Sequence, residues 1–312
     1  MIACEAAFVE CGTIVRGLKG RRARWTGCAT FPPPTSVDET VRLASQSVNA
    51  ALQAGQRRVR VDAIIPGLNV RVEETYPYSS ATLNTVALQT VLNTDLIGGA
   101  QSCTLLFPSA GAAAAAATQY RRDGVTLPEG VRTGSFSDTP SEHANVLVAP
   151  VATRGDPLLP LLEGAVASAP QAVWMLLNAD LSADRAAVGM RESARRARFE
   201  DSFERAFYFR NVFMVKRPTL RAVEKGALLF CYGAGWSVFA LQTDGYELVK
   251  RCDKMPSVEE LTSVVSAASA RNVSRSRAAE NAGADAAFLR TIAGSAALVA
   301  AVLAALRLRA GS

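Results

Sequence analysis

Residues 58–69 read RVRVDAIIPGLN, and this stretch decides the fold class. Val59 and Val61 alternate with charged side chains, which is the period of a β-strand, and residues 63–65 continue without a polar face. A strand end of this kind is typical of a sheet that helices cover on both sides, as in α/β proteins. Pro66 and Gly67 then turn the chain at the exit of the strand.

Helices and strands alternate on both sides of this stretch. A capping box, Ser36 with Glu39, opens an amphipathic helix that runs to about residue 54. Further helices are expected over 80–93, over 112–122 and from Pro157 within the segment 153–170. Further strands are expected over 102–108, 145–151 and 171–178, with a polar loop over 123–145. This alternation predicts a mostly parallel, right-handed, Rossmann-like α/β sheet.

The pattern changes after residue 180. A basic helical stretch over 183–203 precedes four strand-like segments, RAFYFRNVFMVK, GALLFCYGA, WSVFALQ and YELVKRC, whose spacing fits antiparallel hairpins. A second capping box, Ser257 with Glu260, opens a helix that runs to about residue 270. We therefore expect a single α/β domain over 31–270 with an appended antiparallel β portion.

The two ends of the chain differ from this domain. Residues 1–30 carry five basic and two acidic side chains, a balance that is typical of an organelle transit leader. A polar linker over 271–285 leads to the apolar stretch 286–309, whose longest uncharged run, 291–306, is shorter than the roughly 20 residues that a membrane-spanning helix needs. Two interpretations stay open: a membrane anchor in which Arg290 snorkels to the surface, or an amphipathic or buried terminal helix.

Composition excludes several functional classes. The formal charge of +6 over 312 residues is too small for a dedicated nucleic-acid-binding protein. A single histidine, His143, excludes His dyads and multi-His metal sites, and the six cysteines form no C-x-x-C pair. We expect no metal and no cofactor, and thiols that pack as small apolar groups.

A weak candidate for ligand binding lies at the strand exits, because open α/β sheets bind ligands beyond the carboxyl ends of their strands. The loop from Ser109 to Gly111 starts a helix, where backbone N–H groups hold phosphates, and Arg154 would add charge. The alternative is that these residues only make turns. We assign no catalytic residue. The candidate ligand-binding residues are Pro66, Gly67, Asn69, Ser109, Gly111, Arg154 and Asn178.

A second candidate surface is basic. Residues 191–225 hold ten basic and five acidic side chains. Such a stretch is either a solvated surface or a contact for anionic lipid or an acidic protein. The candidate contact residues are Arg195, Arg196, Arg198 and Arg217.

The strand ends in their order resemble a known plastid family. The segments are VDAIIPGLN, TLLFPSAGAAA, VLVAPV, WMLLNADL, GALLFCYGAGWSVFAL and GYELVKRCDKMPSVEEL, within about residues 32–268. The family occurs in plants, algae and cyanobacteria, is catalogued as a domain of unknown function, follows a chloroplast adenylate kinase, and includes low-photosystem-II-accumulation proteins. The chain departs from the family pattern at Ser109, where relatives often carry aspartate, and at Met255, where many carry arginine.

The resemblance implies a function and a location. It implies a non-catalytic chloroplast protein at the thylakoid or envelope that assists assembly or maintenance of a photosynthetic membrane complex. Its partners would be membrane-complex proteins or anionic lipid, with the stretch 286–309 as a candidate membrane contact. The alternative, from the fold and the adenylate kinase fusion, is a domain that binds a nucleotide or phosphorylated metabolite at the strand exits, with or without an enzymatic activity.

Overall fold

A nine-stranded sheet forms the centre of the described structure, in the order β3-β2-β4-β5-β1-β6-β7-β8-β9. This computed structural model describes residues 31–64, 79–95, 102–151, 158–181, 185–215, 223–242 and 244–271. The strands are β1 (Arg58–Ile64), β2 (Cys103–Phe107), β3 (Val131–Ser135), β4 (Ala144–Val148), β5 (Val173–Leu177), β6 (Glu204–Val215), β7 (Val223–Cys231), β8 (Gly235–Gln242) and β9 (Gly245–Cys252). The predicted leader, linker and apolar stretch lie outside the described residues.

The sheet has a parallel and an antiparallel part. All pairings from β3 to β6 are parallel, and β6 to β9 pair antiparallel. The prediction of an α/β sheet with an appended antiparallel portion is confirmed. The predicted loop over 123–145 is wrong in one part, because β3 lies within it as a short edge strand paired to β2. Its five residues include Gly134 and alternate too weakly to identify a strand.

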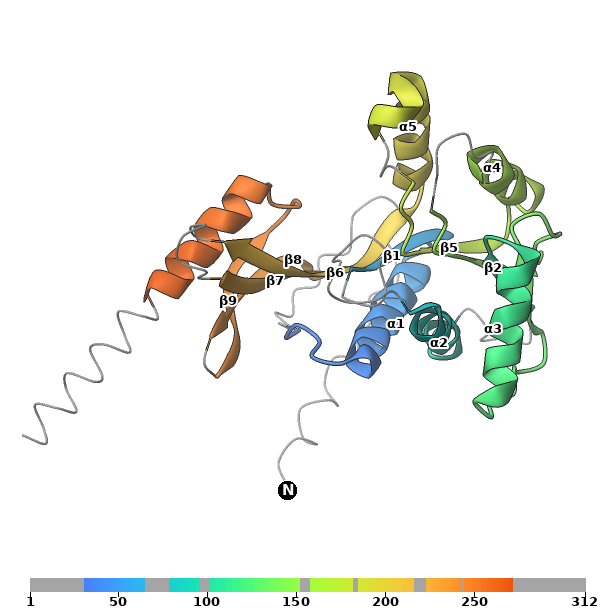
Figure 1. Cartoon of the computed structure of the whole chain (residues 1–312), viewed down its shortest axis with the longest axis horizontal. Coiled ribbons are helices and arrows are strands. Elements are labelled where there is room, and N and C mark those ends of the chain that lie inside the picture. Colours follow the sequence, from blue (N-terminus) through green and yellow to red (C-terminus); the bar gives the residue numbers. More distant parts are fainter. Residues whose placement is uncertain are drawn as a thin grey trace, which may run out of the picture.

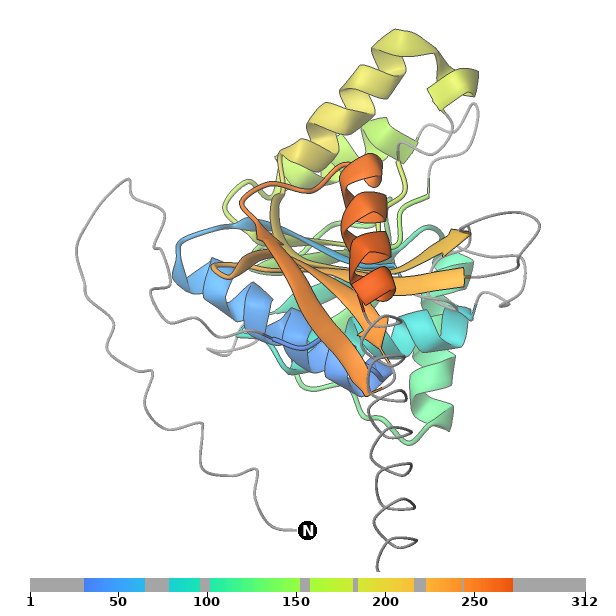
Figure 2. The same cartoon turned by 90° about the vertical axis from the view of Figure 1, so that its left-hand side faces the viewer.

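Helices cover both faces of the sheet (Figure 1). On one face lie α1 (Val37–Gln53), α2 (Ser80–Leu92) and α3 (Ala110–Arg122), and on the other lie α4 (Leu158–Ser168) and α5 (Arg185–Asp201). A further helix, described over residues 258–271 and here called the C-terminal helix, packs on β7 and β8 through Val265 and Ala268. In both views α5 projects away from the sheet (Figures 1 and 2).

The alternation of β1 divides its side chains between the two faces. Val59, Val61 and Ala63 belong to the large apolar core under α1, α2 and α3. Arg60 and Asp62 therefore point to the opposite face, where two smaller apolar cores lie under α4 and α5 and under the C-terminal helix. The charged side chains Arg60 and Asp62 of β1 are thus covered by protein on that face.

Candidate functional site

The strand-exit rim brings together three of the predicted ligand-binding residues. Ser109 and Gly111 follow β2 and Asn178 follows β5, with β4 between these two strands in the sheet. The helices after β2 and β4, which are α3 and α4, lie on opposite faces, so the exits of these two strands diverge as they do at ligand sites of open α/β sheets. Pro66, Gly67, Asn69 and Arg154 lie outside the described residues.

Ser109 caps α3. Its Oγ accepts a hydrogen bond from the N–H of Ala112 at 3.1 Å, which satisfies one of the free donors at the start of the helix. Gly111 lies in the first turn. The hydroxyl of Ser109 thus serves the helix terminus.

Asn178 joins two strands. Its Oδ1 accepts the N–H of Ala63 at 2.7 Å and its Nδ2 donates to the carbonyl of Ala63 at 3.2 Å, so the side chain pairs with β1 as a peptide group would. The residue is 6% exposed and has φ of 48°, in the left-handed region that a non-glycine residue seldom adopts. The side chain of Asn178 therefore holds the rim in shape.

The neighbouring strand end is strained in the same way. Ala149, directly after β4, has φ of 42°, and its N–H donates to the carbonyl of Leu177 at 2.8 Å. The segments that follow β4 and β5 remain paired beyond these residues, since the N–H of Asp180 donates to the carbonyl of Pro150 at 2.9 Å. Left-handed backbone at two adjacent strand exits costs free energy and is a feature that concentrates at binding and active sites.

A group of charged residues on β1, α5 and β6 was not assigned from the sequence. Arg60 donates from Nε to Oδ1 of Asp62 at 2.9 Å and from Nη1 to Oε2 of Glu200 at 2.8 Å. Nε of Arg205 lies 3.7 Å from Oδ2 of Asp62. These four residues are called the charged cluster below. Arg60 and Glu200 are 140 positions apart, so the sequence pattern does not connect them. The one signal in the sequence is that a strand covered on both sides carries the charged residues Arg60 and Asp62.

Burial dominates the electrostatics of the charged cluster. Asp62 is 2% exposed, and this burial raises its pKa, while the charge of Arg60 opposes the rise. The guanidinium of Arg205 lies 5.5 Å from the ring centre of Tyr208 and 5.4 Å from that of Trp236, within the range of cation–π attraction. The two arginines and the two carboxylates have equal and opposite formal charge. The cluster therefore connects β1, α5 and β6 without a net charge in the interior.

The predicted basic contact residues are distributed differently from the expectation. Arg196 is 3% exposed, and it donates to Glu192 and to the carbonyl of Leu181, so its guanidinium is not at the surface. Arg195 is exposed and pairs with Glu163 on α4. Arg198 is exposed and Arg217 lies outside the described residues. The basic surface of α5 in its described part is therefore smaller than the sequence suggests.

Potential nucleophiles in the described core are held in unreactive forms. Burial raises the pKa of the Cys103 thiol to about 12 and that of the Cys231 thiol to about 11. In the same part of the chain, His, Cys, Asp and Glu side chains do not gather in the threes that a metal ion requires. None of the helices described is long and apolar enough to cross a membrane.

Comparison with known proteins identifies one family. The sequence of residues 34–263 matches the family described as Domain of unknown function (DUF1995). No curated protein matches the chain. No solved structure matches it either.

Proposed function

The chain belongs to the DUF1995 family, and from this membership we propose that it is a non-catalytic plastid protein that assists assembly or maintenance of a photosynthetic membrane complex. The resemblance of its strand ends to low-photosystem-II-accumulation proteins supports this role. The proposal includes a location at the thylakoid or envelope. It also assigns the apolar stretch 286–309, which lies outside the described residues, to membrane contact.

The observation that carries the proposal is the geometry of α5. Phe199, near the carboxyl-terminal end of the helix, and Phe203, just after it, pack in the apolar core below α4, and Glu200 is bound by Arg60. The rest of α5 projects from the sheet (Figures 1 and 2), and Arg191 and Arg198 are exposed on it. A projecting helix with exposed arginines is suited to contact an acidic protein face or anionic headgroups.

A complementation experiment tests this role. A plant or algal line that lacks the protein should accumulate less photosystem complex on native gels, and the wild-type gene should restore it. A gene with Arg191→Glu and Arg198→Glu should restore it poorly, whereas the matched pair Arg121→Glu and Arg122→Glu, on the opposite face in α3, should restore it fully. Normal complex levels in the line without the protein would refute the proposal.

Membrane attachment is tested separately. Carbonate extraction of chloroplast membranes should leave the full-length protein bound and release a chain truncated after Asp285. If both are released, the stretch 286–309 is not an anchor, and α5 and the rest of the domain must supply any membrane contact.

A second function is favoured by the strain at Ala149 and Asn178. These residues lie at adjacent strand exits, where α/β domains bind nucleotides and phosphorylated metabolites, and the resembling family includes a fusion to adenylate kinase. A ligand specific for the native state must raise the melting temperature. A panel of nucleotides and sugar phosphates at millimolar concentration should include one that does so, and a panel without effect would exclude this function.

A further inference from the structure

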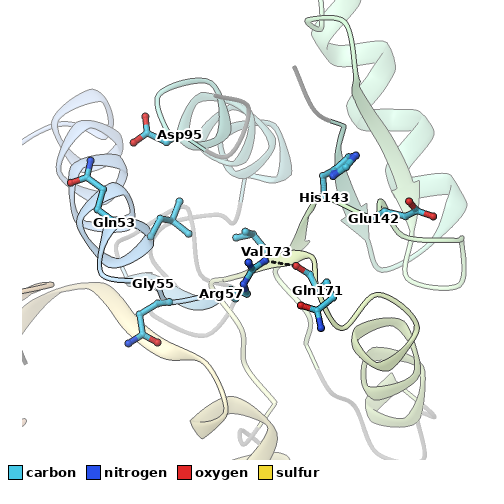
Figure 3. A pocket seen from close by; sticks show the side chains of 10 residues that line it. Gln53, Gly55, Arg57, Asp95, Glu142, His143, Gln171 and Val173 are labelled. Atoms are coloured by element: carbon cyan, nitrogen blue, oxygen red, sulfur yellow. Dashed lines mark hydrogen bonds between the residues drawn. The ribbon is translucent and has the colours of Figure 1, made fainter. Parts of the chain in front are cut away.

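A pocket lies at the amino-terminal ends of β1, β4 and β5, at the opposite end of these strands from the strand-exit rim. Its volume is about 510 Å³, within the range of roughly 300–1,000 Å³ that is typical of small-molecule sites. Four segments line it: the end of α1 with the turn that follows to Arg57, the residue Asp95 after α2, the residues before β4, and the residues before and at the start of β5. Figure 3 shows Arg57 and Gln171 between two walls, one with Gln53 and Asp95 and the other with His143.

The walls of the pocket are fixed by hydrogen bonds. The N–H of Trp174 donates to the carbonyl of Arg57 at 2.7 Å, and the N–H of Val173 donates to the carbonyl of His143 at 2.7 Å. The N–H of Asp95 donates to Oδ1 of Asn49 on α1 at 2.8 Å. The backbone of the pocket is therefore held in place before a ligand binds, which lowers the entropic cost of binding.

The charges of the pocket are kept apart. Nη1 of Arg57 donates to the carbonyl of Gln171 at 2.6 Å, which orients the guanidinium and leaves its other N–H groups available. Both Arg57 and Asp95 line the pocket, yet no salt bridge joins them. One oriented guanidinium and the separate carboxylates of Asp95 and Glu142, with glutamine amides beside them, are complementary to a molecule that carries both a carboxylate and an ammonium group.

We propose that this pocket binds a small zwitterion of the amino-acid type, with its carboxylate on Arg57 and its ammonium group on Asp95. A phosphorylated ligand fits less well, because the carboxylates of Asp95 and of Glu142, which lies on the wall with His143, oppose additional negative charge. The site is independent of the function proposed above, since α5 and the strand-exit rim do not contribute to it.

The single histidine of the chain makes the test direct. His143 lines the pocket, so the histidine ring signals in an NMR spectrum of the whole protein report on this site alone. The proteinogenic amino acids are added at fixed pH, first pooled and then singly, and inorganic phosphate and glucose 6-phosphate are added in parallel. At least one amino acid should shift the His143 signals saturably at millimolar concentration or below.

Two variants connect the shift to the charges. Arg57→Gln and Asp95→Asn should each weaken the affinity about tenfold or more, as expected for loss of a charged hydrogen-bond partner. Arg42→Gln, an exposed change elsewhere on α1, should leave the affinity unchanged. Asp95→Asn preserves shape, so it stays informative if Arg57→Gln perturbs folding. No shift with any amino acid, a shift with the phosphates alone, or equal affinity in all variants would overturn the proposal.

Discussion

Asn178 shows how one side chain can replace a peptide group at a strand end. Replacement by alanine would leave the buried N–H and carbonyl of Ala63 without partners, and alanine fits the left-handed φ less well. We expect Asn178→Ala to lower the free energy of unfolding by about 1–3 kcal/mol, measured by urea denaturation. The exposed control Asn93→Ala, at the end of α2, should cost about 0.5 kcal/mol or less. Equal costs would contradict the assigned role.

The three cysteines in the described part of the chain differ in the accessibility of their thiols. Cys103 and Cys231 are buried and their pKa values are raised to about 12 and about 11. Cys252 is only half-buried near the sheet edge, where partial burial also raises its pKa. Because the thiolate is the reactive form, iodoacetamide at neutral pH should label Cys252 well before the other two. Mass spectrometry of peptides from the native protein gives the order, and labelling in denaturant should remove the difference. Early labelling of Cys103 would contradict the buried core.

Both predicted capping boxes form only in part. Ser36 and Ser257 accept the expected N–H groups, at 3.1 Å and 3.2 Å. The carboxylate of Glu39, however, accepts from N of Thr35 at 2.7 Å and from its hydroxyl, and Glu260 pairs with Lys250 of β9. Local sequence therefore predicts the helix start, and neighbouring segments decide which partner the glutamate takes.

The Glu39 contacts predict a pH dependence. Hydrogen bonds from Thr35 lower the pKa of Glu39 below its ordinary value of 4.5, so the folded state binds this proton less readily than the unfolded state. The stabilisation is present above pH 4.5 and is lost as the pH falls through the lower folded pKa. Thermal melts should show a lower melting temperature for Glu39→Gln at pH 7 and a smaller difference from wild type in acid. Glu129→Gln, an exposed loop change, should show neither effect.

The C-terminal helix depends on a glycine of the sheet. A Cβ at Gly226 in β7 would lie 2.6 Å from the carbonyl oxygen of Phe239 and 3.1 Å from a methyl carbon of Val265. Gly226→Ala should destabilise the fold by about 1–3 kcal/mol and increase hydrogen exchange over 258–271. Gly164→Ala in α4, where a Cβ meets open space, should instead stabilise by up to about 1 kcal/mol. A neutral Gly226→Ala would refute the close packing.

At the scale of the molecule, the two faces of the sheet are built differently. One face is a continuous apolar core under α1, α2 and α3, whereas the other holds two separate apolar cores. In the charged cluster, Glu200 accepts the N–H of Leu181, which belongs to the core under α4 and α5. Arg205 contacts the rings of Tyr208 and Trp236, which belong to the core under the C-terminal helix. We infer that the cluster links the two cores across β1 and β6.

Removal of one member of the charged cluster should therefore affect the whole fold. Asp62→Ala would leave Arg60 and Arg205 with a single carboxylate and should cost about 3–5 kcal/mol in guanidinium denaturation, as expected when a buried ion pair loses one partner. Glu163→Gln breaks the exposed pair with Arg195 and should cost no more than about 1 kcal/mol. Similar costs for the two variants would show that the cluster carries little of the stability.

The sequence by itself determined the fold class, the positions of most elements and the helix starts at Ser36 and Ser257, because hydrophobic periodicity and capping are local properties. It could not identify β3, because the alternation of this strand is weak and its pairing with β2 is a tertiary contact. The order of strands, the burial of Arg196, the charged cluster and the pocket at His143 were decided by the tertiary structure alone. Each unites residues distant in the chain, and their proximity depends on how the elements pack.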